Sequence, residues 1–329
     1  MARYLAGRIA GLVLILFTVC LFTYLIFFKL SADPALMICG KTCTPDRIAQ
    51  IRMVLGLDKP FLTQFWDFLS GLVVGRDYGS GVNLIHCPAP CLGYSFQTNQ
   101  SVMRMILDRL PVSATVAVGA AVLWLIVGIA AGLLSAVKEG TWWDRTAMGL
   151  ALGGASIPNY VLALSLQYVL VVKLQVLPFP SVVSFSDDPV IWFQSYLMPW
   201  IVLATGYACL YARLTRSNVI DTLAENFMRT ARSKGLPPVL MMRRHALRPA
   251  LTPIATIFGM DFAALLGGAL ITETVFGLNG VGKMAADSIA KNDQPVIMAV
   301  TLLAAFFVVV GNVVVDLVYT GLDPRVRIR

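Results

Sequence analysis

The chain has 329 residues, of which 57% are hydrophobic and only 13% are charged, and its mean hydropathy is +0.75. Soluble domains carry roughly 25% charged residues, so this composition excludes an ordinary water-soluble protein. The net charge of +8 is better explained by the orientation of loops at a membrane than by binding to nucleic acid.

Six long stretches of the sequence carry almost no charge. They are residues 9–28, 110–137, 146–172, 189–212, 249–272 and 294–315. A helix needs about 20 residues to cross the hydrocarbon layer of a bilayer, and every stretch reaches that length. The sequence therefore predicts an all-α integral membrane protein with six transmembrane helices.

The first stretch follows Arg3 and Arg8, as the apolar core of a cleaved signal peptide would. It is longer than such a core, and no small-x-small cleavage site follows it in residues 29–33. We therefore expect residues 1–29 to form a short tail and a retained first helix. With the N-terminus in the cytoplasm, more than half of the 26 Lys and Arg residues face that side, as the positive-inside rule requires. Both termini are thus expected to be cytoplasmic.

Residues 30–102 are expected to form a small extracytoplasmic cap, and residues 103–329 a core of five further helices. Within the cap, Pro45 and the sequence Asp58-Lys59-Pro60 each mark the start of a short helix. A segment of this length with few apolar faces buries too little surface to fold alone. The cap should therefore pack against the membrane helices.

Four of the six cysteines fall in the cap. They are Cys39, Cys43, Cys87 and Cys91. Disulfides persist outside the cytoplasm, and four cysteines allow three pairings that the sequence does not separate. A metal site built from His86, Cys87 and Cys91 is the alternative. We favour disulfides and expect no metal site.

The most informative segment is the cytoplasmic loop 214–250, which follows the fourth helix. Asn218 is a favourable N-cap, and Gly235 followed by Pro237 is a favourable stop, so the pattern predicts one helix over residues 219–234. Its apolar residues recur at steps of three and four and are Val219, Ile220, Leu223, Ala224, Phe227, Met228 and Ala231. Such an amphipathic helix either rests on lipid headgroups or docks into a groove of a partner protein.

Two further features bear on the class of protein. Residues 277–284 approach a phosphate-binding loop, but Met284 stands where Ser or Thr must hold magnesium, and we expect no enzymatic activity. Asp261 is the one charged residue in the six stretches, and a charge inside the membrane is a functional candidate. It either lines a translocation pathway, or is protonated or paired with a helix of a second subunit. An ion-coupled secondary transporter usually carries several such groups, so that class is less favoured.

Residues 228–236 have the sequence MRTARSKGL, and residues 244–251 have the sequence RHALRPAL. Together they resemble the cytoplasmic EAA loop of ABC importer permeases, with Arg229 and Thr230 in place of the Glu and first Ala of the general motif. Further matches follow in family order at residues 55–60, 109–111, 273–277 and 322–325. The chain thus resembles the permease subunit of a bacterial ABC-type dipeptide or oligopeptide importer. Cysteines in the cap and a charge at Asp261 depart from the usual family pattern.

The resemblance implies a type I importer permease fold in the bacterial inner membrane. It also implies a second homologous permease, two ATP-binding subunits and an extracytoplasmic substrate-binding protein as partners. No cofactor is expected in this chain, because ATP and Mg²⁺ would bind to the ATPase subunits. Helix 219–234 would then be the coupling helix that transmits ATPase motions. The residues implied in coupling are Leu223, Phe227, Met228, Arg229, Thr230, Ala231, Arg232 and Gly235. The expected cargo is a di- or oligopeptide, and nickel, glutathione or another small solute is the alternative.

Overall fold

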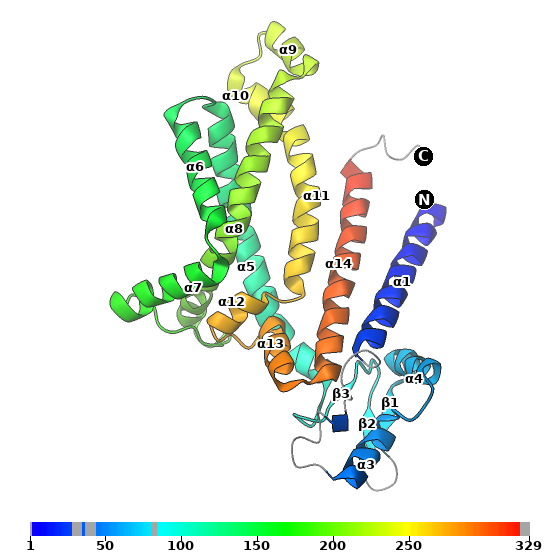
Figure 1. Ribbon diagram of the computed structural model, residues 1–329. Coiled ribbons are helices and arrows are strands. Elements are labelled where there is room, and N and C mark those ends of the chain that lie inside the picture. Colours follow the sequence, from blue (N-terminus) through cyan, green and yellow to red (C-terminus); the bar gives the residue numbers. More distant parts are fainter. Residues whose placement is uncertain (1, 28–34, 37–43, 80–83, 323–329) are drawn as a thin grey trace.

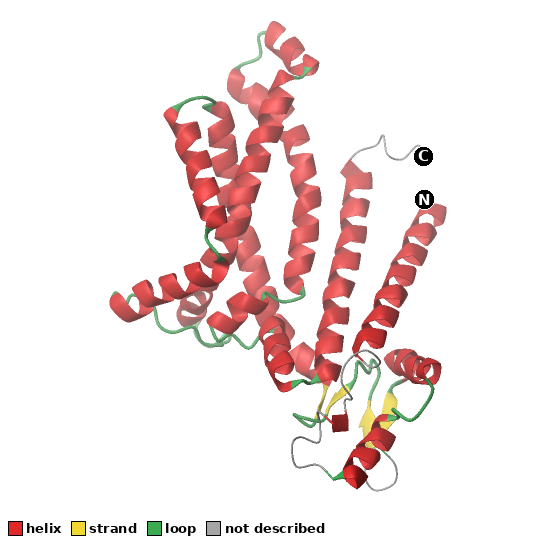
Figure 2. Ribbon diagram, viewed as in Figure 1, coloured by secondary structure: helices red, strands yellow, loops and turns green. Residues whose placement is uncertain are grey.

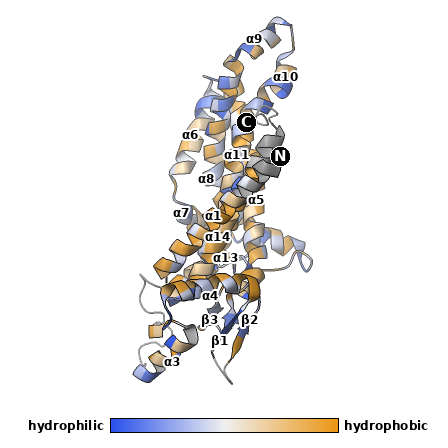
Figure 3. Ribbon diagram, turned by 90° about the vertical axis from the view of Figure 1, so that its right-hand side faces the viewer, coloured by the Kyte–Doolittle hydropathy of each residue, from blue (hydrophilic) through white to orange (hydrophobic). Residues whose placement is uncertain are grey.

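The computed structural model describes residues 2–27, 35–36, 44–79 and 84–322, and helices dominate this part of the chain (Figure 2). Long helices run side by side, with a small cap at one end and the helices α9 and α10 at the other (Figure 1). The first helix begins, and the last helix ends, on the α9 side (Figure 1). Apolar residues concentrate along the long helices, whereas polar residues are frequent at the α9 end and in the cap strands (Figure 3).

Four helical segments in the described residues are long and apolar enough to span a membrane. They are α5 (Val102–Val137), α8 (Pro189–Ala224), the segment Pro238–Leu266 and the segment Gln294–Val315. The third contains α10 (Pro238–Met241) and α11 (Leu247–Leu266), joined by a π-helical turn, and the fourth belongs to α14 (Gln294–Leu322).

The stretch predicted as the third span is broken rather than continuous. Helix α6 (Trp142–Ser156) and helix α7 (Asn159–Gln167), which continues as π-helical turns to Lys173, meet at an angle of 95°. Pro158 causes the break, because it lacks an N–H to donate and forces the preceding residue out of the helical region. Ile157 accordingly has the extended angles φ −84° and ψ 121°.

The first helix, α1 (Ala2–Leu25), lies beside α14 (Figure 1). Its apolar section, Ala10–Leu25, is shorter than a full span. The described residues therefore provide four spans, or five if the bent pair counts as one, and the predicted number of six is not confirmed.

The centre of the core is the long contact between α5 and α8. Trp124 of α5 and Tyr211 of α8 are completely buried there. Glycines allow the two helices to approach closely, as in other packed membrane helices. A Cβ on Gly132, for example, would lie 2.4 Å from the carbonyl oxygen of Ala212.

The described residues of the cap include the helices α3 and α4 and two hairpins. Helices α3 (Pro45–Leu55) and α4 (Phe61–Val74) occur where the sequence predicts them. The strands β1 (Arg76–Tyr78) and β2 (Ile85–Cys87) pair antiparallel, and so do β3 (Tyr94–Ser95) and β4 (Gln100–Ser101). The sequence analysis did not predict these strands, which are only two or three residues long.

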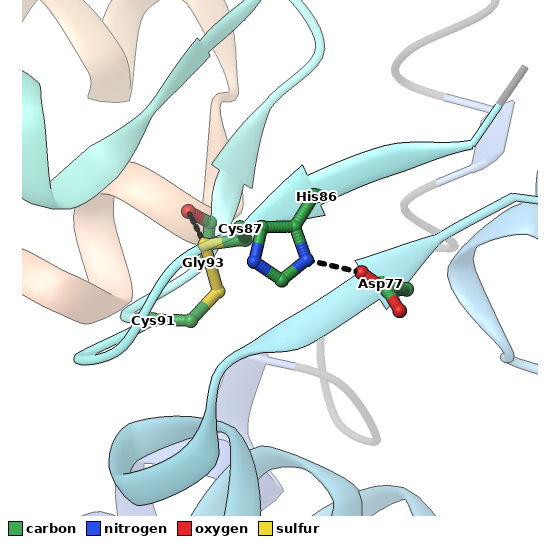
Figure 4. The surroundings of a disulfide bond; sticks show 5 residues. All are labelled: Asp77, His86, Cys87, Cys91 and Gly93. Carbon is green, nitrogen blue, oxygen red and sulfur yellow. Dashed lines mark hydrogen bonds and ion pairs between the residues drawn. A yellow bond between two sulfur atoms is a disulfide. The ribbon is translucent and has the colours of Figure 1, made fainter.

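A disulfide joins Cys87 at the end of β2 to Cys91 (Figure 4). Both cysteines are almost completely buried, and the backbone N–H of Cys91 donates to the carbonyl oxygen of Gly71 in α4. Because their sulfur atoms are bonded to each other, these two residues do not present thiolates to a metal. Cys39 and Cys43 lie outside the described residues.

The cap joins the core through the start of α14. Ser95 of β3 donates a 2.5 Å hydrogen bond to the carboxylate of Asp293, whose side chain is buried. Between α11 and α14, the short helices α12 (Leu270–Val275) and α13 (Val281–Lys291) lie at the same end of the core as the cap (Figure 1).

Candidate functional site

The segment between α8 and α11 protrudes from the end of the molecule opposite the cap (Figure 1). Helix α8 ends at Ala224, Glu225 is extended with φ −64° and ψ 152°, and α9 covers Asn226–Ser233. Gly235 follows with φ +74°, the left-handed conformation that the sequence predicts for it. An added Cβ at Gly235 would meet no atom within 4 Å, so the requirement for glycine there is conformational rather than steric.

The predicted single helix over residues 219–234 is wrong, because α8 continues through its first half. Val219 and Ile220 belong to a hydrophobic cluster with Ala136 of α5 and Ala250 of α11, and this burial keeps them in the long helix. The proposed cap residue Asn218 instead donates its side-chain N–H to the carbonyl oxygen of Ala250, at 3.3 Å. Within residues 219–234, a separate protruding helix is therefore formed only by α9.

The loop has a small hydrophobic core of its own. Met228 and Ala231 of α9 are buried against Met241 and Ala246, and Leu223, Leu236 and Met242 pack around them. Two of the residues expected to contact a partner thus face inward. Leu223 is partly buried in the same cluster.

A different set of loop residues is accessible. Phe227 is 45% exposed, and Arg229, Thr230 and Arg232 are exposed beside it. Val239 and Leu240 of α10 add exposed apolar surface at 71% and 41%. The sequence analysis missed these two residues, although a Val-Leu pair directly after Pro237-Pro238 could have signalled a second short helix.

The outer surface of this loop is strongly basic. Its exposed cations are Arg229, Arg232, Lys234, Arg243, Arg244 and Arg248. In the described part of the chain, none of these cations takes part in an ion pair. The combination of exposed apolar side chains with unpaired cations is suited to an acidic protein surface with an apolar groove.

An ion pair ties α8 to the α5–α6 turn at the same end of the molecule. Arg216 of α8 donates two hydrogen bonds to the buried carboxylate of Asp144, at 2.7 and 2.9 Å. Ser135 and the backbone N–H of Gly140 donate to the same carboxylate. Bidentate geometry fixes orientation as well as distance, so this clamp holds α8 firmly about two turns before the loop begins. Local sequence patterns do not predict the pairing of Arg216 with Asp144, because the two residues are 72 positions apart.

Asp261 lies in the C-terminal half of α11, and its partner is within this chain. The hydroxyl of Tyr211 donates a 2.9 Å hydrogen bond to its carboxylate. Aromatic rings pack beside Tyr211: the ring of Trp124 lies 6.0 Å from that of Tyr211 and stacks on Tyr207 at 4.5 Å, measured between ring centroids. The sequence analysis singled out Asp261 but did not identify Tyr211.

A cavity of about 550 Å³ opens between α11 and α14 near Asp261. Its lining is almost entirely apolar and includes Phe258 and Phe262, which flank Asp261 in α11. Small residues shape it: a Cβ on Gly311 of α14 would lie 2.3 Å from the side chain of Ala263.

A second buried carboxylate braces the cap-side end of the core. Glu273 of α12 is completely buried and accepts hydrogen bonds from Ser113 of α5 at 2.7 Å and from the backbone N–H of Lys283 at 3.0 Å. The backbone N–H of Val281 in turn donates to the Ser113 hydroxyl at 2.8 Å. Glu273 thereby links α5, α12 and α13, a role that sequence reasoning did not assign.

The family comparisons cover almost the whole chain. Residues 1–117 match the N-terminal model of the membrane component of binding-protein-dependent transport systems, and residues 128–328 match the model of the binding-protein-dependent transport system inner membrane component. Three full-length relatives illustrate the similarity. A putative peptide transport system permease protein of Brucella abortus (strain 2308) is 34% identical over 99% of both chains. A probable peptide ABC transporter permease protein of Sinorhizobium fredii is 32% identical over 99% of this chain and 100% of the relative. The glutathione transport system permease protein GsiC of Escherichia coli (strain CFT073) is 34% identical over 99% of both.

A solved structure supports the fold. The chain resembles a chain of the MetNI methionine ABC transporter in its inward-facing conformation, with a TM-score of 0.56 and 15% identity, over 67% of this chain and 97% of that one. The predicted all-α, type I permease fold is therefore confirmed, apart from the number of spans.

Proposed function

Because this chain belongs to the family of inner membrane components of binding-protein-dependent transport systems, we propose that it passes di- and oligopeptides across the bacterial inner membrane as one permease subunit of an ATP-driven importer. One observation carries the choice of peptides. Relatives that match the chain along its whole length are named peptide transport permeases.

The proposed assembly contains a second homologous permease, two ATP-binding subunits and an extracytoplasmic substrate-binding protein. The termini and the α9–α10 loop face the cytoplasm, and the cap faces outward. Two observations support this orientation. The start of α1 and the end of α14 lie on the α9 side (Figure 1), and more than half of the Lys and Arg residues fall on that side under the positive-inside rule.

The coupling contact in this proposal is made by α9. Phe227, which is 45% exposed, enters an apolar groove of an ATP-binding subunit, while Arg229 and Arg232 pair with acidic groups at its rim. Thr230 contributes a hydroxyl to the same surface. The inward-facing residues Leu223, Met228 and Ala231, together with Gly235, give the loop its shape without touching the partner.

The ion pair between Asp144 and Arg216 allows a contact at α9 to transmit motion into the core. A loop that moved freely on a hinge would absorb the motion of the ATPase. The bidentate ion pair instead makes α8 and the α5–α6 turn move as one body. Motion at α9 is thus passed to α5, with which α8 shares its longest contact.

In the translocation pathway, Asp261 is the proposed polar contact for a peptide. Its carboxylate is partly accessible and is held by Tyr211. The chemistry suits an ammonium group, because a carboxylate and neighbouring aromatic rings both attract cations. The amino terminus of a peptide supplies such a group.

Glutathione is the second candidate cargo, because GsiC is as similar to this chain as the peptide permeases are. Nickel and other small solutes complete the alternatives. Competition for uptake separates these cargoes. Cells that carry the complete transporter as their sole peptide importer are given a labelled tripeptide, with excess unlabelled peptide, glutathione or nickel as competitor.

We expect unlabelled peptides to abolish uptake of the label, and glutathione and nickel to leave it unchanged. A strain that lacks only this chain is the control and should take up no label. A transporter that takes up labelled glutathione but no labelled tripeptide would be assigned to glutathione, and tripeptide uptake without this chain would contradict the proposal.

A further inference from the structure

Helix α4 of the cap carries two apolar stripes, and only one of them is covered by the protein. The covered stripe consists of Phe61, Phe65, Phe68 and Leu72, at steps of four, three and four. The second stripe consists of Leu62, Trp66, Leu69 and Val73, with the same spacing. Residues with this spacing share one face of a helix, so the two stripes lie next to each other around α4.

The covered stripe fixes the depth of α4 relative to the membrane. Phe65 and Phe68 pack in one cluster with Cys20 and Tyr24 of α1 and with Met298 of α14. Met298 lies inside the membrane-spanning segment Gln294–Val315. Phe65 also contacts Phe17 of α1, at 5.8 Å between ring centroids, within the apolar section Ala10–Leu25. The helix therefore packs beside the apolar segments and does not lie beyond their ends.

The second stripe is strongly exposed. Leu62 is 75%, Trp66 69% and Val73 78% exposed, and Leu69 joins the two stripes as a partly buried residue. A contiguous row of large apolar side chains in water is unfavourable and marks an interaction surface. Phe22 of α1 and Ile26, which directly follows α1, are also exposed, at 60% and 49%.

The third side of α4 is polar and faces a polar cleft. Asp67 forms a 2.7 Å ion pair with Lys59, and Ser70 lines the same cleft of about 370 Å³. Helix α4 therefore separates a polar side from an apolar side at the depth of the membrane surface. It also lies crosswise to the long helices (Figure 3).

We propose that α4 is an interfacial helix immersed in the leaflet on the cap side, and that phospholipid acyl chains cover its second stripe. The pattern of a polar side, an apolar side and a tryptophan at the boundary is typical of helices that lie in the plane of a membrane. The helix anchors the cap to the bilayer, and this anchoring holds whether the cargo is a peptide or another solute.

Site-specific photocrosslinking tests the proposal in the complete transporter in native membranes, with its binding protein present. The photoreactive residue p-benzoylphenylalanine replaces Val73 in one variant and Trp66 in a second. In a matched control it replaces Asp67, one residue from Trp66 but on the polar side, where its carboxylate pairs with Lys59. Adducts are identified by mass spectrometry after illumination.

The expected result is a phospholipid adduct at Val73 and at Trp66, with a yield severalfold above that at Asp67. Both replaced side chains are exposed, so the substitutions leave the packing of the helix intact. A crosslink from Val73 to the binding protein or to another subunit would overturn the proposal. So would the absence of a phospholipid adduct at Val73, or an equal yield at Val73 and Asp67.

Discussion

At the scale of single residues, Asp261 is a carboxylate within a membrane-spanning segment, and it accepts a hydrogen bond from Tyr211. Such groups are costly in the bilayer and are retained where they serve a function. The two residues also connect α8, which leads into the α9–α10 loop, to α11, which borders the apolar cavity.

We predict that Asp261→Asn lowers uptake of peptides with a free amino terminus more than uptake of the same peptides after acetylation. The amide keeps the size of the side chain and removes the negative charge that attracts an ammonium group. Tyr211→Phe, which removes the hydrogen bond but keeps the charge, should have the smaller effect. Initial uptake rates of the two peptides measure the difference. An equal loss for both peptides would argue against contact with the amino terminus.

Glu273 is a buried residue whose hydrogen bonds stabilise the fold. Glu273→Ala leaves the Ser113 hydroxyl and the Lys283 N–H without their buried acceptor, and an unsatisfied buried polar group costs about 1–3 kcal/mol. We therefore expect a clear fall in the melting temperature of the purified complex. Glu273→Gln retains an acceptor oxygen and should lose much less. If both variants melt at the temperature of the parent, the bracing role is wrong.

At the scale of elements, packing within the loop decides which apolar residues of α9 are accessible to a partner. Met228 and Phe227 are neighbours in the sequence, yet Met228 is buried within the loop and Phe227 is not. Ala231 is likewise buried in the core of the loop, so the carboxylate introduced by Ala231→Asp would be buried there. That substitution would disrupt the loop itself before any contact with a partner.

Phe227→Ala and Met228→Ala therefore form a matched pair. We predict that Phe227→Ala leaves the melting temperature unchanged but strongly reduces co-purification of the ATP-binding subunits. Met228→Ala removes a buried side chain, which typically costs about 2–5 kcal/mol, and should destabilise the loop. Limited proteolysis at the loop and pull-down of the ATPase measure the two effects. Normal ATPase binding by Phe227→Ala would contradict docking through α9.

The stabilising contribution of the contact between the cap and the start of α14 is expected to depend on pH. Burial raises the pKa of the Asp293 carboxyl, although the hydrogen bond from Ser95 partly opposes the shift. The folded state thus holds this proton more tightly than the unfolded state. Its stabilising contribution is complete below about pH 3.9, the ordinary pKa of Asp, and is lost as the pH rises through the folded-state pKa.

Asp293→Asn keeps an acceptor for Ser95 and does not ionise. We predict that its melting temperature rises relative to that of the parent protein as the pH is raised from about 4 to neutrality. Melting curves of the two proteins at a series of pH values test this, and all other groups titrate equally in both. A constant difference in melting temperature across the whole pH range would show that Asp293 is not the source of the pH dependence.

The elements also show which features were predictable from the sequence. The four long spans, the two cap helices and the left-handed Gly235 follow from local signals: apolar length, proline at helix starts and a glycine before prolines. The extent of α8 does not, because Val219 and Ile220 are held in it by Ala136 and Ala250 from distant segments. The long-range partners of Asp261, Asp144 and Glu273 could not be predicted for the same reason. They are Tyr211, Arg216 and Ser113, and each lies 50 or more residues from the carboxylate that it binds.

At the scale of the whole molecule, the chain has two functional ends connected by α5 and α8. The basic loop with α9 lies at one end, and the cap with α4 lies at the other (Figure 1). The two clusters of buried polar contacts, around Asp144 and around Glu273, brace these ends. This arrangement is suited to passing a movement along the membrane normal, which an ATP-driven importer requires.

Transport by the reconstituted complex tests the central claim most directly. The permease pair and the ATP-binding subunits are placed in liposomes that enclose ATP, and the binding protein and a labelled peptide are added outside. We predict that uptake requires enclosed ATP and is unaffected when an ionophore collapses proton and sodium gradients. Uptake that proceeds without ATP and follows an imposed ion gradient would contradict the account and indicate a secondary transporter.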